Sequence, residues 1–436
     1  MRVLARDVSK HGDKQIMVQG WLHKKRAMGG IMFVIVRDRS GLVQAVIHDV
    51  KEQAKLDGMQ IGTVLELTGS VKSDDRAMNG AELQDPKITI LVPVTEVPPI
   101  EIDKPLSHAS DNLETLFEYR PIGLRNTHEA AIFKVRAAVA KAIRDYFYQN
   151  DFTEIHTPKL LAAATEGGAD VFKIDYFGRE ATLAQSPQFY KQMMVGVYER
   201  VFEIAPVYRA EPSATTRHMT EYTSVDGEMG FMDIGDLEAF LSGLMNFVVD
   251  EVWDKSKTEL DLLKAQKPVL PKQIPAMTMA DIHEHYTKAT GTKTIGEKDL
   301  RPDEERWICD FAREHLKSDA IYVTDWPASD MKFYHKAQAT NPKLADRIDL
   351  LLGGVEIVTG STRENNYDQL VKQLKTMAGG DPKNPGFKYF LMAMQAGMPA
   401  HAGFGLGLDR LTEKLLGLAN VKEATLFPRD MNRLTP

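Results

Sequence analysis

The spacing of apolar residues changes once along this chain, near residue 126, and this change limits the folds that are open to it. In the first hundred residues apolar and polar side chains alternate in short runs, such as IMVQGWLHKKR at 16–26. Such alternation is typical of strands with one buried face. Further runs are FVIVRD and LVQAVI, joined by a turn that ends at Gly41, and then TVLELTGSV and KITILVPVTEV. Short strands at this spacing predict a small closed barrel, such as an OB-fold.

After residue 126 the apolar residues recur at the spacing of a helix. Ile132, Val135, Val139 and Ile143 fall on one helix face. Strand patterns return at AIYVTDWP and IDLLLGGVEIVTG, and helical patterns at PGFKYFLMAMQAGM and DRLTEKLLGL. Because strands and helices follow one another without regular alternation, we predict an α+β fold whose mostly antiparallel sheet is flanked by helices.

These patterns divide the chain into three parts. We expect a barrel domain at 1–103, a hinge or linker at 104–125 and a larger domain at 126–436. Within the larger domain the polar, helix-rich segment 260–320 is expected to be an insertion outside the core.

Composition excludes several classes of protein. The only cysteine, Cys309, leaves no internal disulfide and no thiolate-rich zinc cage, which fits a reducing cytoplasm. No stretch is apolar enough for a signal peptide or a membrane span, so we expect a cytoplasmic protein without a membrane partner. The net charge of −7 argues against binding nucleic acid in bulk but leaves room for a local basic surface.

The most crowded charged run is RAEPSATTRHMTEY at 209–222. It brings Arg209, Glu211, Arg217, His218 and Tyr222 close together in the sequence. Charged side chains are costly to gather and order unless a partner of opposite charge lies among them. The run therefore predicts a site for a polyanion.

Two glycine-containing segments carry further candidates. GGVEIVTGSTRE sets Glu356 and Thr359 beside a glycine turn, where their oxygens suit Mg²⁺, although a surface salt bridge explains each charge taken singly. GFGLGLDR lacks the βαβ context of a dinucleotide-binding loop. It is either a helix entry that needs close backbone approach or, with Arg410, a contact to a phosphate or a planar ring. The nearby histidines lack the spacing of zinc ligands.

Aromatic rings and positive charge are interleaved in the predicted barrel. KKR at 24–26 lies among Trp21, Phe33 and Arg37. A basic run is usually a solvated face, and a single lysine such as Lys191 is usually a surface charge. Rings beside the charges, however, suit stacking and steering of single-stranded bases.

Taken together, these segments resemble the class II aminoacyl-tRNA synthetases, and among them the archaeal-type aspartyl-tRNA synthetases. The resemblance covers nearly the whole chain. The first predicted helix with FTEIHTP, ending at Pro158, resembles motif 1; VFEIAPVYRAEPSATTRHMTEYTSVDGEMGF resembles motif 2; and HAGFGLGLDRL resembles motif 3. ATEGGAD and QSPQFYKQ lie between the first two motifs. The resemblance implies an N-terminal OB-fold that binds the tRNA anticodon and a class II catalytic domain. It also implies a homodimer, in which the apolar helix face of motif 1 is expected to need a partner.

The resemblance implies a reaction as well. ATP, with Mg²⁺, activates L-aspartate to aspartyl-adenylate, and the aspartyl group then passes to the terminal ribose of tRNA(Asp). Arg209 and Arg410 are the implied catalytic residues, because attack of a carboxylate on the α-phosphorus brings two anions together. Glu211 reads adenine, Arg217 and His218 hold the γ-phosphate end, and Tyr222 and Arg410 cover the two faces of the ring. The implied ATP-binding residues are Arg209, Ala210, Glu211, Arg217, His218, Met219, Tyr222, Glu356, Gly407, Leu408, Asp409 and Arg410.

The other sites are implied in the same way. The Mg²⁺ ligands are Glu356 and Thr359. The implied aspartate-binding residues are Glu166, Gln185, Ser186, Gln188, Lys191, Arg209, Asp226, Thr359 and Arg363, of which Lys191 and Arg363 meet the side-chain carboxylate. The implied anticodon-binding residues are Trp21, His23, Lys24, Phe33 and Arg37.

Several alternatives stay open at this point. Lys191 and Asp226 favour aspartate, whereas GSTRENNYDQL is closer to the asparaginyl-tRNA synthetase pattern, so that enzyme is the alternative. A catalytically silent RNA-binding paralogue is disfavoured by the filled phosphate-binding positions, and an ammonia-dependent asparagine synthetase by the barrel. Family members that charge both tRNA(Asp) and tRNA(Asn) tend to carry His where strict members carry Trp, and His23 holds that position. Asp75 and Arg76, at the second determinant, match neither pattern. We therefore expect charging of tRNA(Asn) as well.

Overall fold

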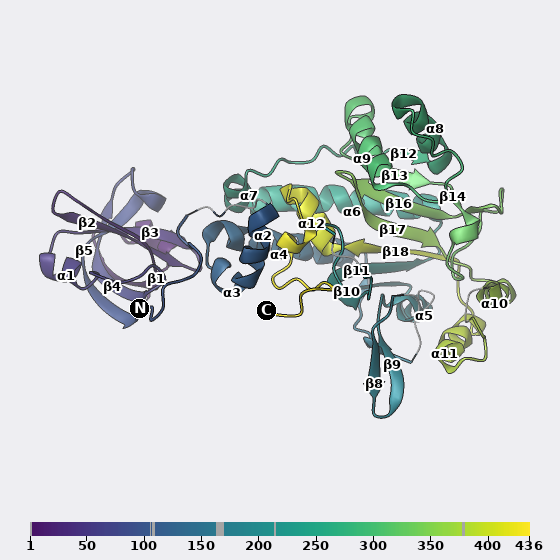
Figure 1. Cartoon of the computed structure of the whole chain (residues 1–436), viewed down its shortest axis with the longest axis horizontal. Helices are drawn as coiled ribbons and strands as arrows, with labels where there is room; N and C mark the ends of the chain where they lie inside the picture. The colour runs from purple at the N-terminus through teal and green to yellow at the C-terminus, as the bar shows by residue number, and fades with distance from the viewer. Residues whose placement is uncertain (1, 105, 107–109, 163–169, 213–214, 377–379) are drawn as a thin grey trace. The chain divides into compact units, whose positions relative to one another are not determined.

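The computed structural model describes residues 2–104, 106, 110–162, 170–212, 215–376 and 380–436 (Figure 1). The chain forms two compact units, Met1–Ala130 and Ala131–Pro436. The first unit contains the closed barrel and the second contains a large sheet with its helices. The change in apolar spacing therefore marks a change in architecture.

Five strands close the barrel of the first unit, as predicted. Their order is β1-β2-β3-β5-β4, with β1 at Gln15–Met28, β2 at Ile31–Asp38, β3 at Gly41–Ile47, β4 at Val64–Ser73 and β5 at Ala81–Val92. Alternation decides which side chains fill the barrel: Val34 and Val36 of β2 are buried, while Phe33 and Arg37 are partly exposed. The short helices of this unit are η1 (Ala5–His11), α1 (Val50–Ala54) and η2 (Met78–Gly80).

The segment expected as a hinge, 104–125, contains helices. They are α2 (Ser110–Glu118) and α3 (Arg120–Gly123). Leu113, Leu116 and Phe117 bury one another in a small cluster. The Pro- and Ser-rich stretch just before these residues indicated a linker, and it masked the short helical spacing that follows.

An eight-stranded sheet forms the centre of the second unit (Figure 1). Its order is β12 (Ala276–Thr278), β13 (Ala320–Thr324), β16 (Arg347–Leu352), β17 (Val355–Thr362), β18 (His401–Gly407), β11 (Glu221–Gly230), β10 (Arg200–Tyr208) and β6 (Thr153–Glu154). The strands from β13 to β10 pair antiparallel, as predicted. The two outermost pairs, β12–β13 and β10–β6, are parallel, so the sheet is mixed at its edges. The small strands are β7 (Leu160–Leu161), β8 (Lys173–Tyr176), β9 (Arg179–Leu183), β14 (Trp326–Pro327) and β15 (Leu344–Ala345).

The helices of this unit pack in two apolar clusters, of which the first includes residues of the sheet. The main core joins the sheet to α4 (Thr127–Gln149), α6 (Ile234–Lys255) and α12 (Leu408–Leu416). The second joins α5 (Gln188–Tyr198), α10 (Tyr367–Thr376) and α11 (Pro385–Gln395). Within the described residues, no helix combines the length and the apolar character needed to cross a membrane.

The apolar face of α4 is covered by the chain itself. Ile132, Val135, Val139 and Ile143 are fully buried in the main core. This face was expected to need a partner subunit. That expectation is wrong, because α6 and the sheet already cover the face.

The helix-rich segment 260–320 is part of the core, contrary to expectation. Its helices are α8 (Met279–Thr290) and α9 (Pro302–Phe311), which follow α7 (Lys257–Leu263), and η3 (Ala312–Leu316) extends α9. Ile274 is buried in the main core, and Ile282 and Ile308 pack with Val323 of β13. The exposed polar side chains of these helices concealed the spacing of the buried ones.

Candidate active site

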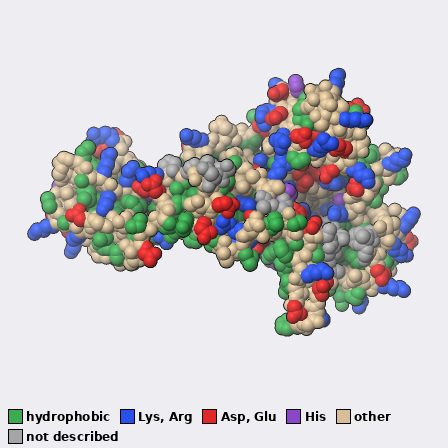
Figure 2. Space-filling model, viewed as in Figure 1, with side chains coloured by type: hydrophobic (Ala, Val, Ile, Leu, Met, Phe, Trp, Pro, Cys, Tyr) green, Lys and Arg blue, Asp and Glu red, His purple; other side chains and the backbone are tan. Residues whose placement is uncertain are grey.

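One cavity of about 420 Å³ collects nearly all of the predicted ligand-binding residues of the second unit. Acidic and basic side chains gather around the hollowed part of this unit (Figure 2). The predicted residues that line the cavity are Gln185, Ser186, Gln188, Lys191, Arg209, Glu211, Arg217, His218, Met219, Tyr222, Asp226, Glu356, Thr359, Arg363, Gly407, Asp409 and Arg410.

Two predicted residues do not line the cavity, and the position of a third is not described. Leu408 is 1% exposed and belongs to the main core, and neither it nor Ala210 lines the cavity. Glu166 lies outside the described residues.

Alternation along the central strands separates this cavity from the core. In β11 Val225 and Met229 point into the main core, so Ser224, Asp226 and Glu228 point to the opposite face. In β18 Phe404 and Leu406 occupy the core, and glycines alternate with them. A polar pocket thus forms on one face of a sheet whose other face is apolar.

Two cations and two carboxylates form a buried network at this pocket. Nζ of Lys191 lies 2.9 Å from Oδ1 of Asp226 and donates to the carbonyl of Phe404 at 2.8 Å. Nε and Nη2 of Arg363 donate to the two oxygens of Glu228 at 2.7 and 3.1 Å. Burial alone would raise the pKa of Glu228, but Arg363 and Lys191 outweigh it and hold that pKa below its usual value.

Glycines make room for this network. A Cβ on Gly403 would lie 1.8 Å from Oε2 of Glu228, whereas one on Gly405 would lie 3.6 Å from Asp226. The glycines of the third motif therefore lie in a strand and admit buried carboxylates, and the helix begins only at Leu408. The helix-entry reading was correct for the last of them, Gly407, which precedes that helix.

Arg217 and Arg410 are held by neighbouring segments. Nη1 of Arg217 lies 2.6 Å from Oε2 of Glu305 on α9, and its Nη2 donates to the carbonyl of Gly354 at 3.0 Å. Arg410 donates to the carbonyl of Glu356 at 3.0 Å and to that of Arg217 at 3.4 Å. The guanidinium groups are thus fixed by contacts that span distant parts of the sequence.

The remaining residues of the predicted polyanion site are more exposed. Oε1 of Glu211 lies 3.6 Å from Nη1 of Arg209, and its Oε2 lies 3.7 Å from Nε2 of His218. The guanidinium of Arg209 lies over the ring of Tyr222, 5.6 Å from its centroid. Burial, with the charges of Arg410, Arg209 and Arg217, lowers the pKa of His218 despite Glu211. The imidazole of His218 is therefore neutral at pH 7 in the absence of a ligand.

Asp409 is occupied by protein partners. Its Oδ1 accepts hydrogen bonds from Arg136 at 2.9 Å and from Thr425 at 3.1 Å, and its Oδ2 accepts one from the backbone of Thr223 at 2.8 Å. These contacts tie the start of α12 to α4 and β11, so the carboxylate supports the wall of the cavity.

The predicted Mg²⁺ ligands lie side by side. The hydroxyl of Thr359 donates to Oε1 of Glu356 at 2.8 Å. Burial would raise the pKa of Glu356, but Arg410 and Arg347 hold it below its usual value. Asp349, which the sequence analysis missed, pairs with Thr359 across β16 and β17. Burial and the charge of Glu356 raise its pKa to about 7, even though Arg347 opposes this.

Two carboxylates and a hydroxyl form a donor set that suits a hard divalent cation. Among the described residues, no group of three or more His, Cys, Asp or Glu side chains has the geometry of a metal site. Asp349 could have been found from the sequence, because it is the only acidic residue in β16, the apolar strand before the glycine turn.

The predicted anticodon residues lie on the outer face of β1 and β2. Trp21 pairs with Arg37 across β1 and β2, and the guanidinium of Arg37 lies 5.0 Å from the centroid of the Trp21 ring. The guanidinium of Arg26 lies 5.0 Å from the centroid of the Phe33 ring. The register of β1 against β2 shifts between Leu22 and Lys24, at His23, and such irregularities re-aim side chains. Burial and the charge of Arg37 lower the pKa of His23. Lys24 is exposed.

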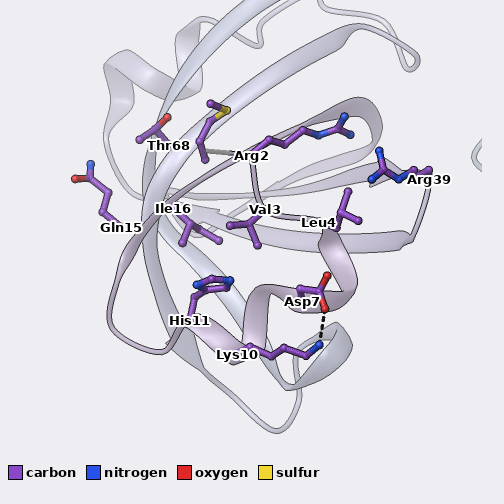
Figure 3. A pocket seen from close by; sticks show the side chains of 11 residues that line it. Arg2, Val3, Leu4, Asp7, Lys10, His11, Gln15, Ile16, Arg39 and Thr68 are labelled. Atoms are coloured by element: carbon purple, nitrogen blue, oxygen red, sulfur yellow. Dashed lines mark hydrogen bonds and ion pairs between the residues drawn. The ribbon is translucent and has the colours of Figure 1, made fainter.

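The barrel unit contains a second, more open cavity of about 850 Å³ (Figure 3). Arg2 and Arg39 lie on one side of it, and Lys10 and His11 lie on the other, where Lys10 contacts Asp7 at 2.6 Å. None of the predicted anticodon residues lines it.

Comparison with known proteins extends these observations. The family described as "tRNA synthetases class II (D, K and N)" matches residues 112–431, and the family described as "OB-fold nucleic acid binding domain" matches residues 16–91. The chain is 40% identical to the "Aspartate--tRNA(Asp/Asn) ligase" of Thermus thermophilus over the whole of both chains. It is 35% identical to the "Aspartate--tRNA(Asp) ligase" of Pyrococcus horikoshii, covering 97% of this chain and 96% of that one.

Solved structures agree with these matches. The asparaginyl-tRNA synthetase of Pyrococcus horikoshii complexed with asparaginyl-adenylate is similar with a TM-score of 0.91 and 29% identity, over the whole of both chains. The two family models thus match the barrel and the larger part of the chain separately, and the solved structure is similar to the whole chain. The chain belongs to the class II tRNA synthetases of the D, K and N group, with an N-terminal OB-fold.

Proposed function

We propose that this chain activates L-aspartate with ATP and transfers it to tRNA(Asp) and also to tRNA(Asn). The observation that carries the choice of amino acid is the pair of buried cations in the pocket, Lys191 and Arg363, which are 1% and 4% exposed. Relatives named for aspartate and for both tRNAs support the proposal.

Activation uses the positive charges of the cavity. The carboxylate of aspartate is ionised at pH 7, so it attacks the α-phosphorus without a general base. Arg209 meets the attacking carboxylate and the α-phosphate, and Arg217 and His218 bind the far end of the triphosphate. The fixed guanidinium groups of Arg209 and Arg217 offset the charge that develops on phosphorus and so lower the barrier, while the neutral imidazole of His218 contributes a hydrogen bond. Pyrophosphate leaves and aspartyl-adenylate remains.

Recognition of aspartate depends on donors that remain after the network has formed. The ammonium of Lys191 has three N–H groups, and Asp226 and Phe404 accept two of them. Oε2 of Glu228 lies 3.5 Å from the same nitrogen, and we propose that the third N–H turns from it to the side-chain carboxylate of the substrate. Asparagine would present a neutral amide to a pocket arranged for an anion, and such mismatches are rejected steeply.

The amide of Gln188 is placed for the other end of the amino acid. The side chain lines the same cavity. Its Nε2 is buried and has no hydrogen-bond partner among the described residues. A buried donor of this kind is satisfied when a ligand oxygen arrives. We propose that Gln188 orients the amino-acid backbone of the substrate, together with Ser186.

Glu356 and Thr359, with Asp349 as an additional ligand, are proposed to hold Mg²⁺. When bound, the cation would neutralise phosphate charge and favour in-line attack. Two carboxylates this close repel one another, and a divalent cation relieves that repulsion. Arg347, which contacts Asp349 through Nε at 3.1 Å, keeps the second carboxylate in place.

The barrel is proposed to read the anticodon. The outer rings of Trp21 and Phe33 suit stacking on bases, and Arg37 and Lys24 supply positive charge. His23 is smaller than the Trp of strict family members, which supports acceptance of both tRNAs. We further propose that the enzyme acts in the cytoplasm as a homodimer.

A direct experiment compares ATP–pyrophosphate exchange with aspartate and with asparagine. Exchange with aspartate alone is the expected result. Exchange with asparagine at a similar rate would contradict the pocket assignment and favour an asparaginyl enzyme, while no exchange with either would favour a silent RNA-binding protein. Aspartylation of tRNA(Asp) and tRNA(Asn) transcripts by the same preparation then tests the dual specificity. A preference for tRNA(Asp) above about a hundredfold would exclude it, because one mismatched base is worth only roughly 1–3 kcal/mol.

A further inference from the structure

Helix α9 reaches the ATP end of the cavity through one ion pair. Oε2 of Glu305 lies 2.6 Å from Nη1 of Arg217. The two side chains are only 18% and 22% exposed, so water screens the pair less than it screens a surface salt bridge. Burial raises the pKa of Glu305 although Arg217 acts against it, which means that the carboxylate lies where an unpaired negative charge would be costly.

The second hydrogen bond of Arg217 leads to the same helix. Its acceptor is the carbonyl of Gly354, in the turn between β16 and β17. This turn lies against α9: a Cβ on Gly354 would meet Arg306 at 2.8 Å, and the backbone of Gly354 hydrogen-bonds to Cys309. Glu305, Arg306 and Cys309 thus fix both the turn and the guanidinium that binds to it.

This arrangement restricts the guanidinium in a way that one contact could not. A planar guanidinium held at Nη1 and at Nη2 by two rigid acceptors keeps a fixed orientation. An arginine that is already ordered loses little side-chain entropy when a phosphate binds it. Arg410, which donates to the carbonyl of Arg217 at 3.4 Å, ties the backbone of the same residue to α12.

We propose that Glu305 is a positioning residue for ATP, which orients Arg217 toward the triphosphate and thereby makes α9 part of the nucleotide site. The proposal rests on the proposed function, since it assigns Arg217 to ATP. It gives the segment 260–320 a role in binding that its polar composition did not indicate.

Electrostatics and positioning lead to opposite expectations for Glu305→Gln. Removing a negative charge near the phosphates would by itself strengthen ATP binding. Loss of the ion pair instead releases Arg217 and weakens binding. We expect the KM for ATP in aspartate-dependent pyrophosphate exchange to rise about tenfold at saturating Mg²⁺, with the KM for aspartate unchanged. An unchanged or lower KM for ATP would overturn the proposal.

Matched variants make the result specific. Glu314→Gln removes the same charge from η3, where the side chain is 73% exposed, and should leave both KM values unchanged. Glu305→Asp keeps the charge and should recover part of the loss. In an Arg217→Ala background Glu305→Gln should have no further effect, because the two residues act as one unit. An additional loss in that background, or a raised Mg²⁺ requirement without a change in the KM for ATP, would assign Glu305 to the metal or to another group instead.

The thiol of Cys309 reports on the fold of these variants. Burial raises its pKa to about 12, and the side chain is 1% exposed, so it should resist alkylation while α9 stays packed. Continued protection in Glu305→Gln, together with the raised KM for ATP, supports positioning. A raised KM that appears only with a reactive thiol and is not recovered by Glu305→Asp would point to unpacking of α9 and overturn the proposal. Absence of exchange in the unaltered protein would instead contradict the proposed function itself.

Discussion

Carboxylates around one cavity carry different pKa values because their nearest charges differ. Glu228 is fully buried, yet Arg363 and Lys191 hold its pKa below the usual value. Asp349 is equally buried and has Arg347 beside it, but the charge of Glu356 adds to the effect of burial and raises its pKa to about 7. Burial alone therefore predicts neither shift, and the sign of the second charge that acts on each carboxylate decides the outcome.

Arg209→Ala should reduce pyrophosphate exchange at least about a hundredfold, or roughly 3 kcal/mol in activation free energy, because a charged phosphate loses a fixed partner. Arg179→Ala is a suitable control, since Arg179, on β9, lies over the ring of Tyr176 and does not line the cavity. Exchange by the Arg209 variant within about threefold of the unaltered protein would remove this residue from the mechanism.

The buried imidazole of His335 should make stability depend on pH. Burial, with the charge of Arg363, lowers its pKa well below the usual value. The folded state therefore excludes a proton that the unfolded state accepts below about pH 6.5, so stability is lost as pH falls through that value. The raised pKa of Asp349 changes stability with pH in the opposite direction. The contribution of His335 must therefore be measured against a variant that lacks the imidazole.

His335→Gln should remove the contribution of the imidazole. The free energy of unfolding of the unaltered protein, relative to this variant, should fall by up to about 1.4 kcal/mol for each pH unit below about pH 6.5. Denaturant unfolding of both proteins across this range measures the difference. A difference that stays constant with pH would show that His335 does not exclude the proton.

At the scale of elements, the central strands separate an apolar core on one face of the sheet from a polar pocket on the other. β11 presents apolar side chains to the core on one face and buried carboxylates on the other, and β18 presents apolar side chains on one face and glycines on the other. Because adjacent residues of a strand point to opposite faces, a shift of one residue in register would exchange the two sets. The charges and the core thus specify the same pairing, in which Asp226 faces Gly405 and Glu228 faces Gly403.

Gly403→Ala should destabilise the protein by about 1–3 kcal/mol or more, because the added methyl overlaps a carboxylate that cannot leave without breaking its pair with Arg363. Gly405→Ala, two residues along the same strand, adds its methyl at an ordinary contact distance and should change stability by less than about 0.5 kcal/mol. Denaturant unfolding of both variants tests this contrast. Equal stability of the two would mean that the network adapts to the loss of space.

At the scale of the whole molecule, the two units are proposed to divide the work between them. The barrel presents rings and positive charge on β1 and β2, and the second unit holds the cavity with the predicted ATP and aspartate residues. Each unit has its own apolar core, so a change on the barrel surface should alter tRNA selection without altering chemistry.

His23→Trp should therefore lower aspartylation of tRNA(Asn) by about tenfold or more while leaving exchange with aspartate unchanged. The control is His48→Trp, because His48 is an exposed histidine of the same unit that lies outside β1 and β2. Loss of both tRNA substrates in equal measure would indicate damage to the barrel and not a change of specificity.

The homodimer is proposed from the edge of the sheet. β6 is the last strand of the order and pairs with β10, and the exposed Tyr148 at the end of α4 donates to Glu154 in this strand. An edge strand flanked by an exposed aromatic ring suits pairing with a second copy. Light scattering should give about twice the 48.9 kDa of one chain. A fully active monomer at micromolar concentration would contradict this.

The barrel, the antiparallel centre of the large sheet and the charged run 209–222 of the cavity lining could be predicted from the sequence alone. Each of these depends on local patterns: alternation in 16–26, helical spacing in α4, and the charges of 209–222 all lie within short windows. Resemblance to a family added the roles, and it placed Lys191 and Arg363 in one pocket although the chain between them is long.

The pairing of buried charges became apparent only in the folded chain. Arg363 meets Glu228 across 135 positions and Arg217 meets Glu305 across 88, and no pattern of apolar spacing encodes such contacts. The same holds for α9, whose exposed polar residues suggested an insertion while Ile308 and Cys309 were buried against β13. Periodicity reports which side of an element faces the core, but the partner of a buried charge depends on how separate elements are stacked, and that is fixed only when the chain folds.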